Sequence, residues 1–199
     1  SSTTSVLCIA YDTTNQKSMI GYTNNGSSYM PTAVVASISG TDVSFGTPSA
    51  FGGGIYNSNY KAISYDSVES KMIFAYTDGS NNGKAVAAAI SGTGVIIPAS
   101  VSYTSGQGYD VGLAYDATAD KTIILFRIGP ANDGAAVVVS LSGYTLSFGT
   151  VNTFETADIY YPSPVYDSNL GKVVCVYSDS STNIVARTAT ITGTSVGLS

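Results

Sequence analysis

The sequence contains no histidine and no tryptophan, and it has only two cysteines among its 199 residues. Without histidine, Ser-His-Asp and Cys-His catalysis and every histidine-ligated metal site are excluded. Charged residues are also scarce: they make up 11% of the chain, less than half the usual share of a soluble protein. This composition excludes a coiled coil, a charge-rich disordered tail and a helical bundle. No apolar run approaches the roughly 18 residues of a membrane-spanning helix, so we expect no membrane insertion.

The charges that are present carry a small acidic excess. Eight Lys and Arg residues against thirteen Asp and Glu residues give a net charge of −5, without any block of like charges. A nucleic-acid partner is therefore not expected. Glycine and tyrosine are abundant instead, with 21 and 15 copies. The chain opens at Ser1 with neither a start methionine nor a signal peptide, and we expect a mature product or a segment of a longer protein.

One pattern recurs four times along the chain. It begins with a Tyr-Asp pair, and the four pairs follow one another at intervals of 54, 50 and 51 residues: Tyr11-Asp12, Tyr65-Asp66, Tyr115-Asp116 and Tyr166-Asp167. Five residues after each Asp stands a lysine, and five residues after each lysine stands an aromatic residue. Each copy closes with a Ser-Gly or Thr-Gly pair: Ser39-Gly40, Ser91-Gly92, Ser142-Gly143 and Thr192-Gly193. Agreement of these features in one register indicates a tandem repeat.

Each copy is predicted to form four short strands, because its apolar segments are rich in Val, Ile, Thr, Tyr and Phe and are bounded by Gly, Asn, Asp and Ser. Four strands in about fifty residues is the size of one propeller blade. We therefore predict an all-β fold, a four-bladed β-propeller that forms a single domain over residues 1–199. The repeats span approximately 1–54, 55–104, 105–156 and 157–199. An open array of the same sheets, cut from a longer chain, is the second possibility, and a two-sheet sandwich is the third.

The first strand of each copy ends at the Tyr-Asp pair and is predicted to lie nearest the propeller axis. The position four residues before each Asp is small in all four copies, which suits a crowded centre: Cys8, Ala62, Gly112 and Ser163. We expect the repeated Asp to accept backbone N–H groups of its turn, and the Lys to cap the other side of the hairpin. The repeated Tyr is expected to pack between blades with its hydroxyl bonded at the rim. Cys8 and Cys175 are predicted to be buried free thiols, with a disulfide between first and last blade as the alternative.

The long, irregular loops carry the candidate binding residues. Because strand direction alternates, the short repeated turns lie on one face of the predicted propeller and the long loops on the other. Binding sites are often carried by loops on a rigid scaffold, and tyrosine mixed with Asn, Asp, Ser and Gly is an adaptable contact composition. The candidates are Tyr29, Tyr56, Tyr60, Asp78, Tyr103, Tyr109, Asp133, Asp158 and Tyr160. Loops that are merely solvated and rich in turn formers are the alternative. No catalytic residue, metal site or cofactor is predicted.

The repeated unit also has a resemblance. Its motif, Tyr-Asp-x4-Lys-x4-Tyr followed by Ile-Ser-Gly-Thr-x-Val-Ser-Phe-Gly-Thr-Pro at 38–48, resembles a tandem repeat of predicted virion and tail-fibre proteins of marine bacteriophages. The match covers essentially the whole chain. The third copy departs from it at Arg127 and Tyr144, and the fourth stops before the Phe-Gly-Thr-Pro element. The resemblance implies an extracellular or virion-surface appendage, for which a host glycan is one implied contact.

Three functions compete on this basis. A non-enzymatic structural or adhesive module, with one loop face for receptor or subunit contacts, is the preferred interpretation. A glycan-binding, lectin-like propeller is the alternative; it should repeat its polar ligand residues in all four blades, and the loops do not align in that way. A glycosidase is least favoured, because it needs two carboxyl groups about 5–10 Å apart and no pair of loop acids is singled out. The expected partners are a glycan or protein receptor, or neighbouring copies of the chain itself.

Overall fold

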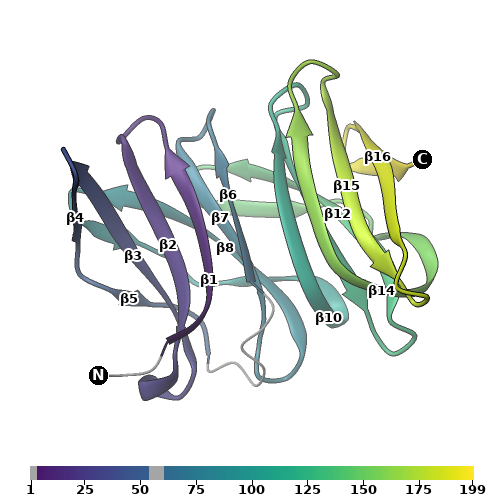
Figure 1. Cartoon of the computed structure of the whole chain (residues 1–199), viewed down its shortest axis with the longest axis horizontal. Coiled ribbons are helices and arrows are strands. Elements are labelled where there is room, and N and C mark those ends of the chain that lie inside the picture. Colours follow the sequence, from purple (N-terminus) through teal and green to yellow (C-terminus); the bar gives the residue numbers. More distant parts are fainter. Residues whose placement is uncertain (1–3, 54–60) are drawn as a thin grey trace.

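The computed structural model describes residues 4–53 and 61–199, and strands dominate it (Figure 1). The only helical element within these residues is a short 3-10 turn, η1 (Asn25–Ser27). The described part of the chain therefore contains no helix that is long and apolar enough to cross a membrane. The all-β class predicted from the sequence is confirmed.

The strands form four successive antiparallel groups, which we call blades 1 to 4. Blade 1 contains β1 (Thr4–Asp12), β2 (Lys17–Asn24), β3 (Met30–Ser39) and β4 (Asp42–Phe45), with β5 (Ser49–Ala50) paired to β3. Blade 2 contains β6 (Lys61–Asp66), β7 (Lys71–Thr77), β8 (Asn82–Ser91) and β9 (Gly94–Ile96). Blade 3 contains the second half of β10 (Val101–Asp116), then β11 (Lys121–Ile128), β12 (Asp133–Ser142) and β13 (Thr145–Phe148). Blade 4 contains the second half of β14 (Asn152–Asp167), then β15 (Lys172–Asp179), β16 (Ile184–Thr192) and β17 (Ser195–Leu198).

Two long strands pass from one blade to the next. β10 pairs with β8 near its beginning and with β11 from Gly108 onwards. β14 likewise pairs with β12 near its beginning and with β15 from Ile159 onwards. Blades 2, 3 and 4 are consequently joined by one continuous hydrogen-bonded path. The connection into each of blades 3 and 4 is thus itself a strand and not an irregular loop.

The repeated Asp closes the first turn of every blade. In all four blades its Oδ1 accepts hydrogen bonds from the backbone N–H groups two and three residues further on, at 2.9–3.1 Å. Lys71 and Lys121 donate to the carbonyl oxygens of Glu69 and Asp120 in their own turns, each at 2.9 Å. Lys17 instead reaches the carbonyl oxygen of a residue in blade 2, Gly92, at 2.6 Å. The structural role predicted for the Asp is confirmed.

The repeated Tyr joins neighbouring blades at the same rim. The hydroxyl of Tyr65 in blade 2 is hydrogen-bonded to Thr14 in the turn of blade 1 at 2.9 Å. The hydroxyl of Tyr166 in blade 4 is hydrogen-bonded to Thr118 in the turn of blade 3 at 2.6 Å. These two junctions confirm the predicted packing between blades. Both cysteines are free, with Cys175 buried and Cys8 partly buried.

Neighbouring blades pack a face of large apolar side chains against a face of small ones. At the first junction, Phe74 and Tyr76 of blade 2 pack in one cluster with Ala33 and Val35 of blade 1. The backbone of blade 1 leaves room for the Phe74 ring at Gly21, where an added Cβ would lie 2.5 Å from a ring carbon. We call the side of a blade that carries its Phe74-like residues the large face, and the opposite side the small face.

The same arrangement recurs at the next two junctions. The large face of blade 3, with Ile124 and Phe126, packs in one cluster with Ala75 and Ala85 from the small face of blade 2. At the third junction the same two faces meet with the sizes evened out: Cys175, which stands at the Phe74 position of blade 4, packs in one cluster with Leu125 and Val138 of blade 3. Apolar burial at these three junctions supplies the hydrophobic core of the molecule.

Closure into a four-bladed ring is not confirmed. The inner strands β1, β6, β10 and β14 lie in a row, each against the next, and the first and last blades stand at opposite sides of the molecule (Figure 1). The side chains of Leu7 on β1 and Val165 on β14 are 72% and 62% exposed, whereas a closed ring would bury both. The four small positions, Cys8, Ala62, Gly112 and Ser163, therefore lie on successive strands of a row and do not surround one axis. These contacts describe an open array, the second of the architectures that the sequence suggests.

A buried lysine lies at the junction of blades 1 and 2. Lys61, at the start of β6, is 9% exposed, and its Nζ donates a hydrogen bond to Oγ1 of Thr23 in blade 1. Burial lowers the pKa of Lys61 from its usual value of 10.5 to about 8, and the nearby Cys8 opposes this shift only in part. The folded state thus releases a proton from Lys61 more readily than the unfolded chain does.

We predict that Lys61→Met raises the stability of the protein below pH 8, and that this gain shrinks as the pH rises towards 10.5. Below pH 8 the unfolded chain and the folded protein both carry the charged lysine, and only the folded protein suffers from burying it. Above 10.5 the lysine is neutral in both states, so the penalty disappears. Thermal melts of parent and variant across this range measure the difference. A gap in melting temperature that does not change with pH would contradict the buried charge.

Candidate functional site

The inner strands of blades 3 and 4 each contain a β-bulge at the same repeat position. The pairing register shifts after Tyr109 in β10 and after Tyr160 in β14. The next residues, Asp110 and Tyr161, have φ angles of 45° and 53°, in the left-handed region that non-glycine residues rarely adopt. A bulge turns side chains out of the regular ladder and is common beside functional sites. The two bulges therefore present Tyr109, Asp110, Tyr160 and Tyr161 at the junction of blades 3 and 4.

Arg127 fills the space between these bulges. It stands near the end of β11, directly opposite Tyr109. The corresponding positions in the other blades, one residue after the repeated aromatic, hold the smaller Thr23, Thr77 and Ser178. Thr77 shows where a side chain at this position points, because its hydroxyl donates to the carbonyl oxygen of Gly108 in the next blade at 2.5 Å. A long arginine side chain at the same place extends across the junction towards blade 4.

The guanidinium of Arg127 is held between two tyrosine rings. Its central carbon lies 5.5 Å from the ring centre of Tyr109 and 5.2 Å from that of Tyr160, within the range of cation–π attraction. Nε lies 3.4 Å from Oδ2 of Asp110, and the hydroxyl of Tyr160 donates to Oδ2 of Asp158 at 3.0 Å. We call these five residues, Tyr109, Asp110, Arg127, Asp158 and Tyr160, the Arg127 cluster.

The charges of this cluster are largely shielded from water. The side chains of Arg127 and Asp110 are 14% and 5% exposed. Burial raises the pKa of Asp110, and the positive charge of Arg127 lowers it again in part. Nε of Arg127 is buried and makes no hydrogen bond within the described residues, although it faces Asp110. The ion pair with Asp110 is therefore the polar contact that compensates this buried N–H.

The sequence predicts some of these residues and misses others. Tyr109, Asp158 and Tyr160 are candidates that the structure brings together. Asp133 lies next to them, since its backbone is opposite Asp158 in the β12–β14 ladder. Asp110 and Arg127 are absent from the candidate set. The departure of the third copy from the repeat at Arg127 is the signal that could have found this site.

Other candidates lie elsewhere or have other partners. Tyr29 follows η1 in blade 1, is exposed, and has a φ of 57°. Tyr56 and Tyr60 lie outside the described residues. Tyr103 is corrected: it is 3% exposed in the core between blades 2 and 3, where its ring packs edge-on against Phe126 at 5.1 Å. Strand β10 begins at Val101, so Tyr103 belongs to a strand and not to a surface loop.

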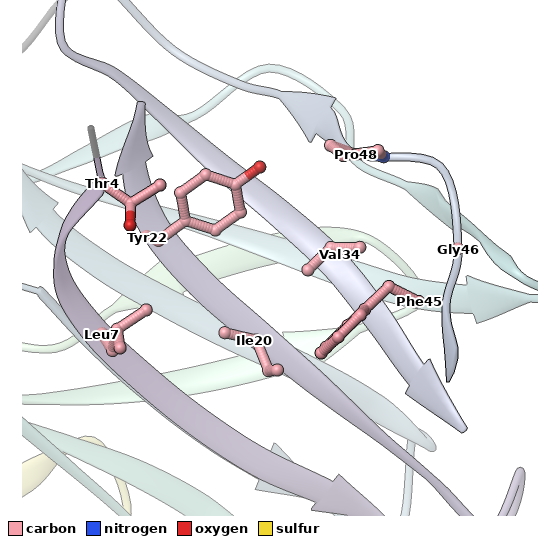
Figure 2. A pocket seen from close by; sticks show the side chains of 8 residues that line it. All are labelled: Thr4, Leu7, Ile20, Tyr22, Val34, Phe45, Gly46 and Pro48. Atoms are coloured by element: carbon pink, nitrogen blue, oxygen red, sulfur yellow. The ribbon is translucent and has the colours of Figure 1, made fainter. Parts of the chain in front are cut away.

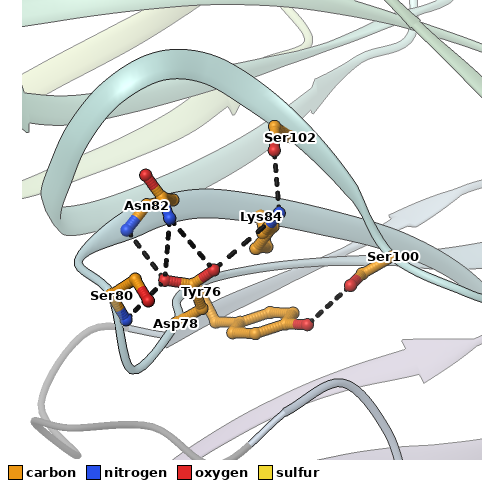
Figure 3. Close-up of polar contacts among 7 residues, drawn as sticks. All are labelled: Tyr76, Asp78, Ser80, Asn82, Lys84, Ser100 and Ser102. Atoms are coloured by element: carbon orange, nitrogen blue, oxygen red, sulfur yellow. Dashed lines mark hydrogen bonds and ion pairs between the residues drawn. The ribbon is translucent and has the colours of Figure 1, made fainter.

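Asp78 closes a turn at the end of β7. Its Oδ1 accepts the backbone N–H groups of Ser80 and Asn82 at 2.8 and 2.9 Å, and its Oδ2 lies 3.8 Å from Nζ of Lys84 (Figure 3). Asp179 makes the corresponding turn in blade 4 with two N–H bonds of 2.9 Å. Because the same turn forms in two blades, the Asp78 contacts are those of a structural Asx turn.

The second arginine of the chain has a complete set of partners. Nη2 of Arg187 lies 2.9 Å from Oε2 of Glu155, and its Nε donates to the hydroxyl of Tyr177 at 2.8 Å. This triad ties the beginning of β14 to β15 and β16. Among the described residues, no three His, Cys, Asp or Glu side chains are grouped so that they could hold a metal ion. The Arg127 cluster is therefore the candidate site.

Comparison with solved structures finds a similar fold. AofleA from Arthrobotrys oligospora matches with a TM-score of 0.61 and 8% identity, over 96% of this chain and 55% of AofleA. A form of AofleA with three arginines replaced by alanine matches with a TM-score of 0.63 and 8% identity, over 96% of this chain and 56% of that one. No family model and no curated protein matches the sequence.

At this identity the likeness shows the fold alone. The chain shares the β-propeller type of blade array with AofleA, and it spans just over half the length of that protein. An open array of four blades agrees with a match to part of a longer chain. Neither matched structure is a virion or tail-fibre protein by name, so the resemblance to phage repeats gains no support from them.

We predict that Arg127→Ala lowers the free energy of unfolding by about 2 kcal/mol near neutral pH, because it leaves the buried carboxylate of Asp110 without its countercharge. Without Arg127 the pKa of Asp110 rises further above its unfolded value. Acid then protonates the folded state first, so the deficit should shrink as the pH falls through that pKa. Urea unfolding at several pH values measures both effects. Arg127→Lys, which keeps the charge, is the control. A deficit that is equal at neutral and acid pH would show that only packing is lost.

Proposed function

We propose that the protein is a non-enzymatic, glycan-binding module of lectin type, and that the Arg127 cluster is its binding site. The observation that carries the proposal is the convergence at one junction of the Arg127 guanidinium, the two tyrosine rings that flank it, and the carboxylates of Asp110 and Asp158. The ligand class that suits these groups is a neutral sugar. A net charge of −5 and scarce cations disfavour an acidic one.

The cluster offers the contacts by which proteins hold a hydroxyl-rich ring. Arg127 supplies N–H donors in a planar fork, and the carboxylates of Asp110 and Asp158 supply acceptors. The face of a tyrosine ring can cover the C–H face of a pyranose, and such rings combine an apolar body with a polar tip. Tyr161 adds a ring beside Tyr160, with ring centres 6.3 Å apart, and it is 79% exposed to a ligand. Donors, acceptors and an apolar platform thus stand at one junction.

The geometry is suited to binding because it is held in place before a ligand arrives. The two bulges and Arg127 stand on strands, and their side chains are fixed by the ion pair, the stacked rings and the Tyr160–Asp158 hydrogen bond. Preorganised polar groups lose little entropy on binding. Each carboxylate of the cluster is already paired, Asp110 with Arg127 and Asp158 with the hydroxyl of Tyr160. This pairing supports a role of the cluster in binding, and it does not support a pair of catalytic carboxylates for hydrolysis.

The proposed site occurs once in the chain, because only the third copy has arginine at this position. The loops do not align between blades, which argues against one sugar site in every blade. A single site at the junction of blades 3 and 4 is consistent with this observation.

An adhesive appendage remains compatible with this proposal. A module that attaches a larger assembly to a surface can do so through a glycan, so the two interpretations differ in context and not in chemistry. Extracellular or virion-surface location stays a prediction from the sequence resemblance.

We predict that a glycan array detects binding to neutral oligosaccharides, and that Arg127→Ala and Tyr160→Ala each weaken it by about 10- to 100-fold. That loss corresponds to one charge-assisted hydrogen bond or one stacked ring. Titration calorimetry with the best array ligand measures it, after circular dichroism has shown that the variants fold. We also predict that no reducing sugar is released from any array glycan.

Tyr144→Ala is the matched control, because Tyr144 is an exposed tyrosine on the opposite, turn face of blade 3. It should bind as the parent does. Equal weakening by Tyr144→Ala, or unchanged binding by both cluster variants, would place the site elsewhere. Glycan hydrolysis that disappears in Asp110→Asn would overturn the non-enzymatic assignment.

A further inference from the structure

The two ends of the blade array carry the two kinds of face that meet at each internal junction. Each internal junction joins the small face of one blade to the large face of the next, and this happens three times. Blade 1 has no blade before it in the described residues, so its large face is free. The described residues hold no blade beyond blade 4 either, so its small face is uncovered in this structure.

The free large face of blade 1 has the residue pattern of the buried ones. Ile9, Tyr11, Ile20 and Tyr22 occupy the repeat positions of Ile63, Tyr65, Phe74 and Tyr76 in blade 2. In blade 2 these side chains pack against blade 1. In blade 1, Ile9 and Tyr11 are 63% and 52% exposed, and Ile20 and Tyr22 are half-buried. Apolar side chains that are buried in one copy of a repeat and bare in another indicate a missing neighbour.

A cavity marks the centre of this face. It has a volume of about 430 Å³, and its lining is almost entirely apolar (Figure 2). Side chains from the four strands β1 to β4 line it, among them Leu7 on β1, Ile20 and Tyr22 on β2, and Val34 on β3. Phe45, at the end of β4, closes one side and is itself exposed. A neighbouring small face would fill such a hollow with short side chains.

The free small face of blade 4 has the matching pattern. Its residues correspond in repeat position and strand register to the small face of blade 1: Ser163, Val165, Val174, Val176, Ala186 and Thr188 stand where Cys8, Ala10, Met19, Gly21, Ala33 and Val35 stand. Val165 and Val176 are larger than their counterparts Ala10 and Gly21, and the other four are no larger than theirs or close to them in size. Val165 and Ala186 are exposed.

We propose that two copies of this chain associate head to tail, with the small face of blade 4 in one copy packed on the large face of blade 1 in the next. The occupant of the exposed face is thus a second copy, because the chain itself contains three examples of the interface that would form. This proposal does not depend on glycan binding.

Polar groups at the rim also match. At two internal junctions, a turn residue two positions after the Asp bonds the repeated Tyr of the next blade. Asn169 of blade 4 and Tyr11 of blade 1 are the corresponding pair at the ends. Lys17 reaches Gly92 in the next blade at 2.6 Å, and Lys172 and Gly40 are the corresponding pair. Such an interface is heterologous, since two different surfaces meet, and it can continue beyond two copies.

The test blocks one end at a time. The first variant, Leu7→Glu with Phe45→Glu, blocks the large face of blade 1, and the second, Val165→Glu with Ala186→Glu, blocks the small face of blade 4. All four side chains are exposed, so folding should be preserved. Val68→Glu is the matched control: Val68 is equally exposed but lies in a turn of blade 2, away from both ends. Sedimentation velocity and light scattering over a range of concentrations give the masses.

The parent and the Val68→Glu control are expected to assemble beyond the 20.4 kDa monomer. Each blocked variant alone should associate at least about 100-fold more weakly, because a charge is buried against apolar groups. An equimolar mixture of the two blocked variants should form a 1:1 dimer and stop there, since one intact pair of faces remains. A parent that stays monomeric to millimolar concentration would overturn the proposal. So would dimers of the second variant alone, which would show that two large faces pair with each other.

Discussion

The packing of large side chains from one blade into the small-residue face of the preceding blade is the contact on which the rest of the structure depends. The Phe74 ring needs the space that Gly21 leaves, and equivalent burial at the next two junctions supplies the remaining core. A blade is a single sheet that buries its faces only against its neighbours, so an isolated blade would expose the apolar side chains of both faces. The stability of each blade therefore depends on its neighbours. The two outermost faces have the residue pattern of the buried faces but no neighbour in this structure.

The sequence predicts the features that depend on local contacts and repeat in every copy. Four copies of one motif indicate four blades, the Asp forms its turn in each of them, and the Tyr hydroxyl bonds the neighbouring turn at two junctions. Ring closure could not be predicted in this way, because it depends on the angle between blades, and that angle is absent from the pattern of one blade. Tyr103 shows a second limit. The segment between two repeats has the composition of a loop, but backbone pairing with β8 makes it a strand and buries the ring.

The candidate site is a property of a junction and not of a blade. Asp110 and Tyr161 gain their positions from bulges, which no local composition rule reveals, and Arg127 meets Tyr160 only because blades 3 and 4 pack together. Tyr109, Asp158 and Tyr160 could be predicted, because tyrosine mixed with small polar and acidic residues in loops is typical of a binding surface. The arginine was visible only as a departure from the repeat. In a repeat protein, the copy that breaks the pattern in a junction is thus a better guide to function than the pattern itself.

Substituting Gly21 tests the central role of the junction most directly. In Gly21→Val the new side chain would meet the Phe74 ring and the sulfur of Cys8, whereas the control Gly106→Val adds a side chain where nothing lies within 4 Å. The account predicts that Gly21→Val lowers the free energy of unfolding by about 2 kcal/mol, a typical cost of overpacking. Hydrogen exchange should accelerate in β1, β2 and β3 and stay unchanged in β15 and β16. Unchanged exchange in blade 1, or an equal loss of stability in Gly106→Val, would contradict the account.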